Sequence, residues 1–186
     1  MARKPRIWYP GATYHITARG NRRDSIFLDP QDYQRYLNLM KACWDLDYFY
    51  IHAYCLMPNH IHLLLETTDK PPGTIIKSIH TRYAMYFNKR YELTGHVFQG
   101  RFHSRLIKTN DYFLTVSKYI HQNPVEANIV EKPEHYLWSS FSSYLGETKK
   151  APILEMERVL SLFSEPRSLT YQKYVIEKNK DSPLPH

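Results

Sequence analysis

The chain has few cysteines and no long hydrophobic run: of its 186 residues only Cys43 and Cys55 are cysteines. Two cysteines are too few for a disulfide framework, which excludes a small disulfide-stabilised scaffold and leaves both as expected buried thiols. No stretch approaches the roughly 20 apolar residues that span a bilayer, and residues 1–5 lead into no apolar run of signal-peptide type. We therefore expect a cytoplasmic protein with no membrane partner.

Acidic residues are scarce in one part of the chain. Residues 1–125 hold 17 Lys and Arg against 9 Asp and Glu, whereas residues 126–186 hold 8 against 9, within a net charge of +7. Such a basic segment is typical of a protein that binds a polyanion, although the same charge can simply keep a protein soluble. Sixteen tyrosines favour the first interpretation, because exposed aromatic rings stack on unpaired bases.

The hydrophobic pattern predicts an alternation of strands and helices. Asp29 and Pro30 begin one helix as cap and first residue, and Pro58-Asn59 forms the turn of an antiparallel hairpin. Pro124 should end another helix near Asn123. The order is strand 12–18, helix 30–47, strands 49–57 and 60–67, helix 75–91, a half-exposed strand within 97–107, helix 112–122 and a short helix within 138–145.

This order predicts an α+β fold in which helices cover an antiparallel sheet, as in ferredoxin-like or split βαβ proteins. The length suits one domain, which we assign to residues 1–146. Residues 147–186 form a short C-terminal helical extension with weak helical patterns at 153–163 and 169–176. A regulatory role for this extension is open.

His60 and His62 are the first chemical signal. Alternate residues of a strand face the same side, so both imidazoles should point into one place. Two partly buried histidines bonded to backbone carbonyls would explain an isolated His-x-His equally well. As metal ligands they would leave positions open for oxygen ligands, water and a phosphate. An amide oxygen of Asn123 or Gln122 could join them, and a zinc site using Cys55 or His52 is an alternative.

Tyr119 is the second signal, because it lies four residues before Asn123 and therefore on the same helix face. It could simply pack on the sheet with its hydroxyl bonded nearby. A phenol has a pKa of about 10 and needs a metal or positive charge to act as a nucleophile. A histidine pair beside a tyrosine therefore suggests phosphodiester chemistry on nucleic acid.

These motifs resemble a known family. His60-Ile61-His62 is similar to the HUH signature of single-strand nucleases and transposases. The segment 119–125, YIHQNPV, resembles the tyrosine helix of the REP-associated tyrosine transposases, single-tyrosine members of that group. The resemblance covers roughly residues 5–146 and includes four further segments: 14–21 (YHITARGN), 53–59 (AYCLMPN), 98–102 (FQGRF) and 138–140 (WSS).

The resemblance implies an HUH-type fold and a metal-dependent enzyme that cuts and rejoins single-stranded DNA at hairpin or palindromic repeats through a 5′-phosphotyrosine intermediate. Tyr119 would be the nucleophile. His60, His62 and Asn123 would hold Mg²⁺ or Mn²⁺, with Asn123 replacing the glutamine of related insertion-sequence enzymes. Mobility of the gene itself is not implied.

Single-stranded or hairpin DNA is the expected partner, and candidate DNA-binding residues lie in the basic part of the chain. They are Arg6, Arg19, Asn21, Arg22, Arg23, Arg101 and Arg105. A non-catalytic single-stranded nucleic-acid binding protein with a structural histidine pair is the alternative. A histidine-triad hydrolase of small substrates is disfavoured, because Leu64 stands where a third alternating histidine would be. A monomer and a homodimer are both open.

Overall fold

The computed structural model describes residues 7–147 and 151–177. It contains four strands, β1 (Thr13–Arg19), β2 (Phe49–Met57), β3 (His60–Thr67) and β4 (His103–Leu106). The longer helices are α1 (Pro30–Trp44), α2 (Pro72–Tyr91), α3 (Asn110–Glu126) and α6 (Arg167–Ile176). The short ones are α4 (Phe141–Tyr144), α5 (Glu157–Leu160) and the 3-10 turns η1 (Asn21–Arg23) and η2 (Pro133–His135). No helix in these described ranges is long and apolar enough to cross a membrane.

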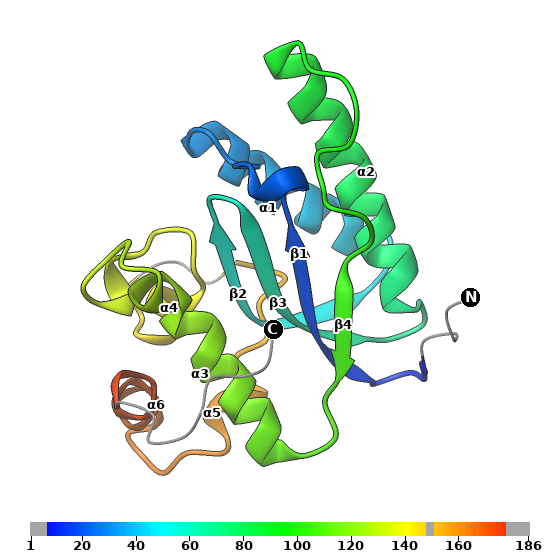
Figure 1. Cartoon of the computed structure of the whole chain (residues 1–186). Helices are drawn as coiled ribbons and strands as arrows, with labels where there is room; N and C mark the ends of the chain where they lie inside the picture. Colours follow the sequence, from blue (N-terminus) through cyan, green and yellow to red (C-terminus); the bar gives the residue numbers. More distant parts are fainter. Residues whose placement is uncertain (1–6, 148–150, 178–186) are drawn as a thin grey trace.

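The strands form one antiparallel sheet in the order β2-β3-β1-β4, so the predicted α+β fold is confirmed. Figure 1 shows α1 and α2 on one side of the sheet and α3 with the C-terminal helices on the other. Strand alternation explains this arrangement. In β3, Leu63 and Leu65 pack in the core under α1 and α2, whereas Leu64 packs in the core under α3.

Several predicted bounds differ from the structure by a few residues, and two of these differences have a local physical cause. Helix α3 continues to Glu126 with Pro124 inside it. A proline in the last turn removes only one helical hydrogen bond, and the amides of Ala127 and Ile129 still bond to the carbonyls of Asn123 and Pro124. Strand β4 is shorter than the predicted 97–107, because Gly100 adopts a positive φ of 64° before it.

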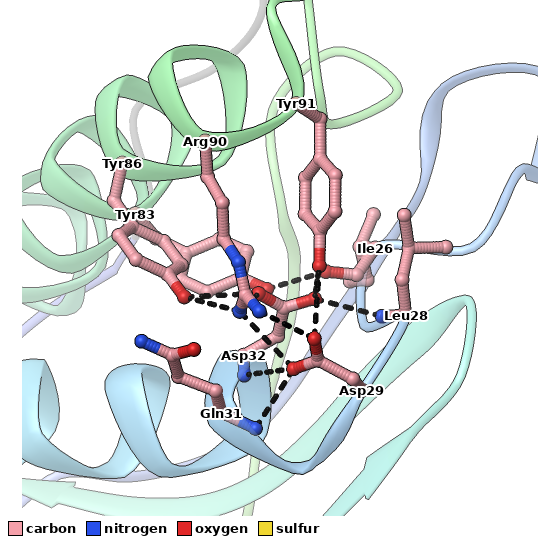
Figure 2. A network of polar contacts seen from close by, with 9 residues as sticks. All are labelled: Ile26, Leu28, Asp29, Gln31, Asp32, Tyr83, Tyr86, Arg90 and Tyr91. Carbon is pink, nitrogen blue, oxygen red and sulfur yellow. Dashed lines mark hydrogen bonds and ion pairs between the residues drawn. The ribbon is translucent and has the colours of Figure 1, made fainter.

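A partly buried polar cluster joins the start of α1 to the end of α2 (Figure 2). Asp29 caps α1 by accepting from the amides of Gln31 and Asp32 at 2.9 and 3.2 Å. Arg90 of α2 bonds to both Asp29 and Asp32, and Asp32 is fully buried. The Asp32 carboxylate also accepts from the amide of Leu28 at 2.8 Å. These bonds fix the segment that connects η1 to α1.

The C-terminal extension completes the core beneath α3 and covers part of the sheet edge. Ile51 of the edge strand β2 exchanges backbone hydrogen bonds with Ile153 and Glu155, at 3.2 and 2.8 Å. Pairing of this kind protects an exposed strand edge. Tyr171 and Val175 of α6 are fully buried in the same cluster as α3. The division of the chain at residue 146 stays a prediction.

Candidate active site

The histidine pair lies on the face of the sheet that α3 partly covers. The ring centroids of His60 and His62 are 4.9 Å apart, so the two side chains do point into one place. His62 is 5% exposed, while His60 is half-buried at the hairpin tip. Strand β1 runs alongside, with Arg19 directly opposite His60 and Thr17 directly opposite His62. The pair therefore sits where a covered part of the sheet meets an open one.

Helix α3 brings Tyr119 and Asn123 to the same place. Thr109 caps the helix by accepting from the amide of Tyr112 at 3.2 Å. The Tyr119 ring lies edge-on to His62 with centroids 5.4 Å apart. Asn123 Oδ1 is 3.4 Å from His60 Nε2, and Asn123 Nδ2 donates to the Tyr119 carbonyl at 3.2 Å. All four residues named by the sequence for catalysis and metal binding thus converge.

The alternative ligands do not join this group. Gln122 Nε2 donates to the carbonyl of Val175, which directs its side chain toward α6. Both ring nitrogens of His52 are engaged, with the Glu155 carbonyl at 3.0 Å and the Glu66 carboxylate at 2.9 Å. Cys55 lies opposite His62 in the sheet, but within the described residues it does not gather with the two histidines into a group of three that could hold a metal ion.

The donor set at His60 fits a divalent cation. Asn59 Nδ2 donates to the Arg23 carbonyl at 3.1 Å, so its Oδ1, 2.7 Å from His60 Nδ1, is oriented to accept a proton from that nitrogen. His60 Nε2 then faces Asn123 Oδ1 with its lone pair. Adjacent ligands of a six-coordinate ion lie about 3 Å apart, close to the 3.4 Å observed between these two acceptors.

Within residues 7–147 and 151–177, no group of three or more His, Cys, Asp or Glu side chains gathers that could hold a metal ion. A cation at His60, His62 and Asn123 would therefore take its remaining ligands from water or substrate oxygens. An open coordination shell of this kind suits a site that acts on phosphate.

Burial controls the ionisation of Tyr119. Desolvation raises the pKa of its phenol, the hydrogen bond with Asn123 lowers it, and the carboxylate of Glu126 raises it. The net shift is upward, so the hydroxyl is protonated near neutral pH. Positive charge supplied by a cation or substrate-bound arginines would be needed to stabilise the phenolate.

His15 belongs to the site, although no sequence motif predicted a role for it. Its Nε2 lies 3.3 Å from His62 Nδ1, and its ring stacks on His62 and meets Tyr119 edge-on at a centroid distance of 5.7 Å. Burial, followed by the charge of Arg105, lowers the pKa of His15 to about 4. Because His15 alternates with buried Tyr14 and Ile16, the sequence indicates that it lies on the opposite face of its strand. That it contacts His62 follows only from the register in which β1 pairs with β3.

A tight contact links the basic turn η1 to the hairpin that carries His60. The amides of Gly20 and Ile26 each donate to the hairpin turn, at 2.8 Å to the Asn59 and Pro58 carbonyls respectively. Gly20 is required here, since a Cβ would stand 2.0 Å from the Asp24 carbonyl oxygen. Arg22 and Arg23 adopt positive φ values of 53° and 67°, a strained conformation often found at functional positions.

The candidate DNA-binding residues fall into two groups, and Arg6 lies outside the described residues. On the sheet face, exposed Arg19 and Arg105 flank the histidines, and Arg105 lies opposite His15 and over the Tyr112 ring at 4.9 Å. The second group lies at the hairpin end. It comprises half-buried Asn21 and exposed Arg22, Arg23 and Arg101; the amide of Asn21 donates to the Val97 carbonyl at 2.8 Å.

The sheet thus presents two histidines to a tyrosine-bearing helix, which is the arrangement expected from the resemblance described above. The family model described as "Transposase IS200 like" matches residues 9–123, and the chain belongs to that family. The matched segment contains His15, the histidine pair, Tyr119 and Asn123.

Two similar proteins confirm the resemblance to REP-associated tyrosine transposases. A protein of that name from Haemophilus influenzae is 29% identical over 101 residues, which cover 48% of this chain and 57% of that protein. The chain thus aligns with little more than half the length of this relative. A solved REP-associated tyrosine transposase bound to a REP hairpin has the same fold, with a TM-score of 0.67 and 20% identity. That match covers 83% of this chain and 98% of the solved one.

Proposed function

We propose that the protein cuts and rejoins single-stranded DNA at hairpin or palindromic repeats, with Tyr119 as the nucleophile. The observation that carries this proposal is the meeting of Tyr119, the histidine pair and Asn123 beside an exposed basic face. Membership of the IS200-like transposase family and the hairpin bound by the similar solved protein support it.

The chemistry is a transesterification. The Tyr119 hydroxyl oxygen forms a bond to phosphorus, the bond from phosphorus to the 3′-oxygen breaks, and the phenol's proton ends on that oxygen through solvent. The products are a 5′-phosphotyrosine and a free 3′-hydroxyl, and the reverse reaction rejoins the strand. One phosphoester replaces another, so the step needs no external energy source.

Mg²⁺ or Mn²⁺ would be held by His60, His62 and Asn123. When bound there, the ion supplies positive charge that stabilises the phenolate and the phosphate oxygens. The chain's own contribution is alignment: the edge-on packing of Tyr119 against His15 and His62 restricts its ring to one position. Restricting the attacking group in this way removes much of the entropic part of the barrier.

The open half of the sheet would hold the DNA backbone. Arg19 and Arg105 project from β1 and β4 on the side of the histidines, and η1 adds Arg22 and Arg23 at the hairpin end. Because Tyr119 and His62 are both nearly buried, a phosphate reaches them more easily from a flexible single strand than from a stiff duplex. Hairpin DNA with an unpaired flank is therefore the substrate we favour.

A denaturing gel of the protein mixed with 5′- and 3′-labelled hairpin DNA and Mn²⁺ tests the proposal. The wild type should give a covalent band, and mass spectrometry should place the adduct on Tyr119. Tyr119→Phe should give neither adduct nor cleavage while still binding the DNA, because it loses only the attacking oxygen.

Tyr50→Phe is the matched control, since Tyr50 lies at the opposite end of the β2–β3 hairpin. It should form the adduct normally. Cleavage that persists in Tyr119→Phe would overturn the nucleophile assignment. Binding without any adduct in the wild type would favour the alternative, a single-stranded nucleic-acid binding protein with a structural histidine pair.

A further inference from the structure

The two histidines of the pair share one arrangement of hydrogen bonds. Each uses Nδ1 for a contact outside the candidate metal position: His60 with Asn59 Oδ1 at 2.7 Å, and His62 with His15 Nε2 at 3.3 Å. A neutral imidazole carries its proton on one nitrogen only. The partner of Nδ1 therefore determines whether Nε2 carries a lone pair or a hydrogen.

At His60, the partner of Nδ1 is Asn59. Its amide group is oriented by the bond from Nδ2 to the Arg23 carbonyl, which leaves Oδ1 as an acceptor. Both amide oxygens can only accept, and a neutral His60 has one proton to donate, so the shorter contact, 2.7 Å to Asn59 against 3.4 Å to Asn123, favours the proton on Nδ1. Its Nε2 lone pair then points toward Asn123 Oδ1, 3.4 Å away.

From the matching contact at His62, we infer that His15 and Asn59 are positioning residues that hold the two metal-binding histidines in the Nδ1–H form, so that both present Nε2 to the metal. This inference rests on the proposed function for the metal's role but concerns the histidines themselves. His15 accepts the His62 proton with Nε2 and carries its own proton on Nδ1.

The position of His15 in the fold supports this role. It lies on the same face of β1 as Thr17, which is directly opposite His62, and its ring stacks on His62 with centroids 5.5 Å apart and planes 23° from parallel. In addition to accepting a proton, His15 therefore restricts rotation of the His62 ring. Outer partners of metal-binding histidines commonly fix both tautomer and orientation in this way.

Nitrogen NMR of the ¹⁵N-histidine-labelled, metal-free full chain tests the inference without any substitution in the protein observed. Spectra of His60→Gln and His62→Gln serve only to assign the signals. In their neutral form, both rings should show a protonated Nδ1 and an unprotonated Nε2. A His62 ring protonated on Nε2 would overturn the inference, whatever the outcome of the DNA experiments.

Calorimetric titration with Mn²⁺ in the absence of DNA gives the second measurement. His15→Phe keeps a ring in place but has no acceptor, and it should weaken Mn²⁺ binding by about 10- to 100-fold. His15→Gln offers an amide oxygen to the same proton and should restore much of the affinity. His103→Phe is the control, because His103 is exposed on the neighbouring strand β4 and should not matter.

The outcomes separate this inference from the proposed function. Unchanged Mn²⁺ affinity in His15→Phe would overturn the positioning role even if the wild type forms the DNA adduct. Weakened binding that Gln restores would support it even if no adduct forms. A wild-type protein that binds no Mn²⁺ would overturn both.

Discussion

At the scale of single residues, two asparagines contact the two ring nitrogens of His60. Asn59 and Asn123 each anchor Nδ2 on a backbone carbonyl and direct Oδ1 toward a ring nitrogen of His60. The orientation of each amide is therefore fixed by its hydrogen bonds. The contact at 2.7 Å favours Asn59 as the acceptor of the His60 proton, which leaves Asn123 Oδ1, at 3.4 Å from Nε2, placed to share the proposed cation with His60.

Asn123→Ala should raise the Mn²⁺ concentration needed for adduct formation by about tenfold, equivalent to about 1.4 kcal/mol, because one ligand is lost. Excess Mn²⁺ should restore much of the adduct, as it cannot do for Tyr119→Phe. The measurement is adduct yield against Mn²⁺ concentration on denaturing gels.

Gln122→Ala provides the comparison for this prediction. It removes the neighbouring amide, which is bonded to Val175, and should leave the Mn²⁺ requirement unchanged. Equal effects of the two substitutions would argue against Asn123 as a ligand.

At the scale of elements, hydrogen bonds join helix α3, which carries Tyr119, to helix α6 of the C-terminal extension. His121 Nδ1 and Ser117 Oγ of α3 lie 2.7 and 2.9 Å from the hydroxyl of Tyr171 on α6, and His121 Nε2 lies 2.8 Å from Ser140 Oγ. All four groups are buried. Because His121 lies two residues from Tyr119, this network stabilises the part of α3 that carries Tyr119.

Tyr171→Phe should lower the free energy of unfolding by about 1–3 kcal/mol, because it leaves buried polar atoms of His121 and Ser117 without their partner. Urea denaturation measures the effect. Tyr48→Phe loses the same atom from an exposed ring and should change stability by about 0.5 kcal/mol or less. Similar small effects for both would mean that the network contributes little to stability.

Local patterns in the sequence were sufficient to predict most of the strands and helices. The hairpin strands 49–57 and 60–67 match β2 and β3, and the cap at Asp29 marks the start of α1. Pro124 misled the prediction because its steric cost near a helix end is small compared with the packing of α3 on the sheet. The preference of proline for a helix end is outweighed here by the tertiary contacts of α3.

In the candidate site, too, local patterns predict some residues and long-range contacts determine another. His60, His62, Tyr119 and Asn123 follow from short motifs and from periodicity within one strand and one helix. His15 could not be placed in this way, because its contact with His62 depends on the pairing of β1 with β3, strands separated by α1 and β2. Long-range register has no signature in a short stretch of sequence.

At the scale of the whole molecule, buried histidines couple stability to pH. Burial lowers the pKa of both His80 and His121 to about 3, against about 6.5 in the unfolded chain. Between these values the unfolded state binds a proton that the folded state does not, so stability falls as the pH drops below 6.5. We expect a loss of roughly 2 kcal/mol per histidine between pH 7 and pH 5.

Urea denaturation at several pH values in this range measures that slope. His80→Phe should make the slope shallower by about one proton, whatever its effect on stability at pH 7. His96→Phe, at an exposed position, should leave the slope as it is. Stability that stays constant or rises toward pH 5 would contradict the expected coupling.

The contact between the hairpin tip and η1 also limits how such a protein can acquire a new target. Asn59 bonds to Arg23 on one side and to His60 on the other, so one side chain belongs both to the loop that we propose to touch DNA and to the candidate active site. A chimera that imported only residues 20–28 from a relative would disturb the chemistry along with the specificity. The smallest transplantable unit is therefore the loop together with the β2–β3 hairpin tip.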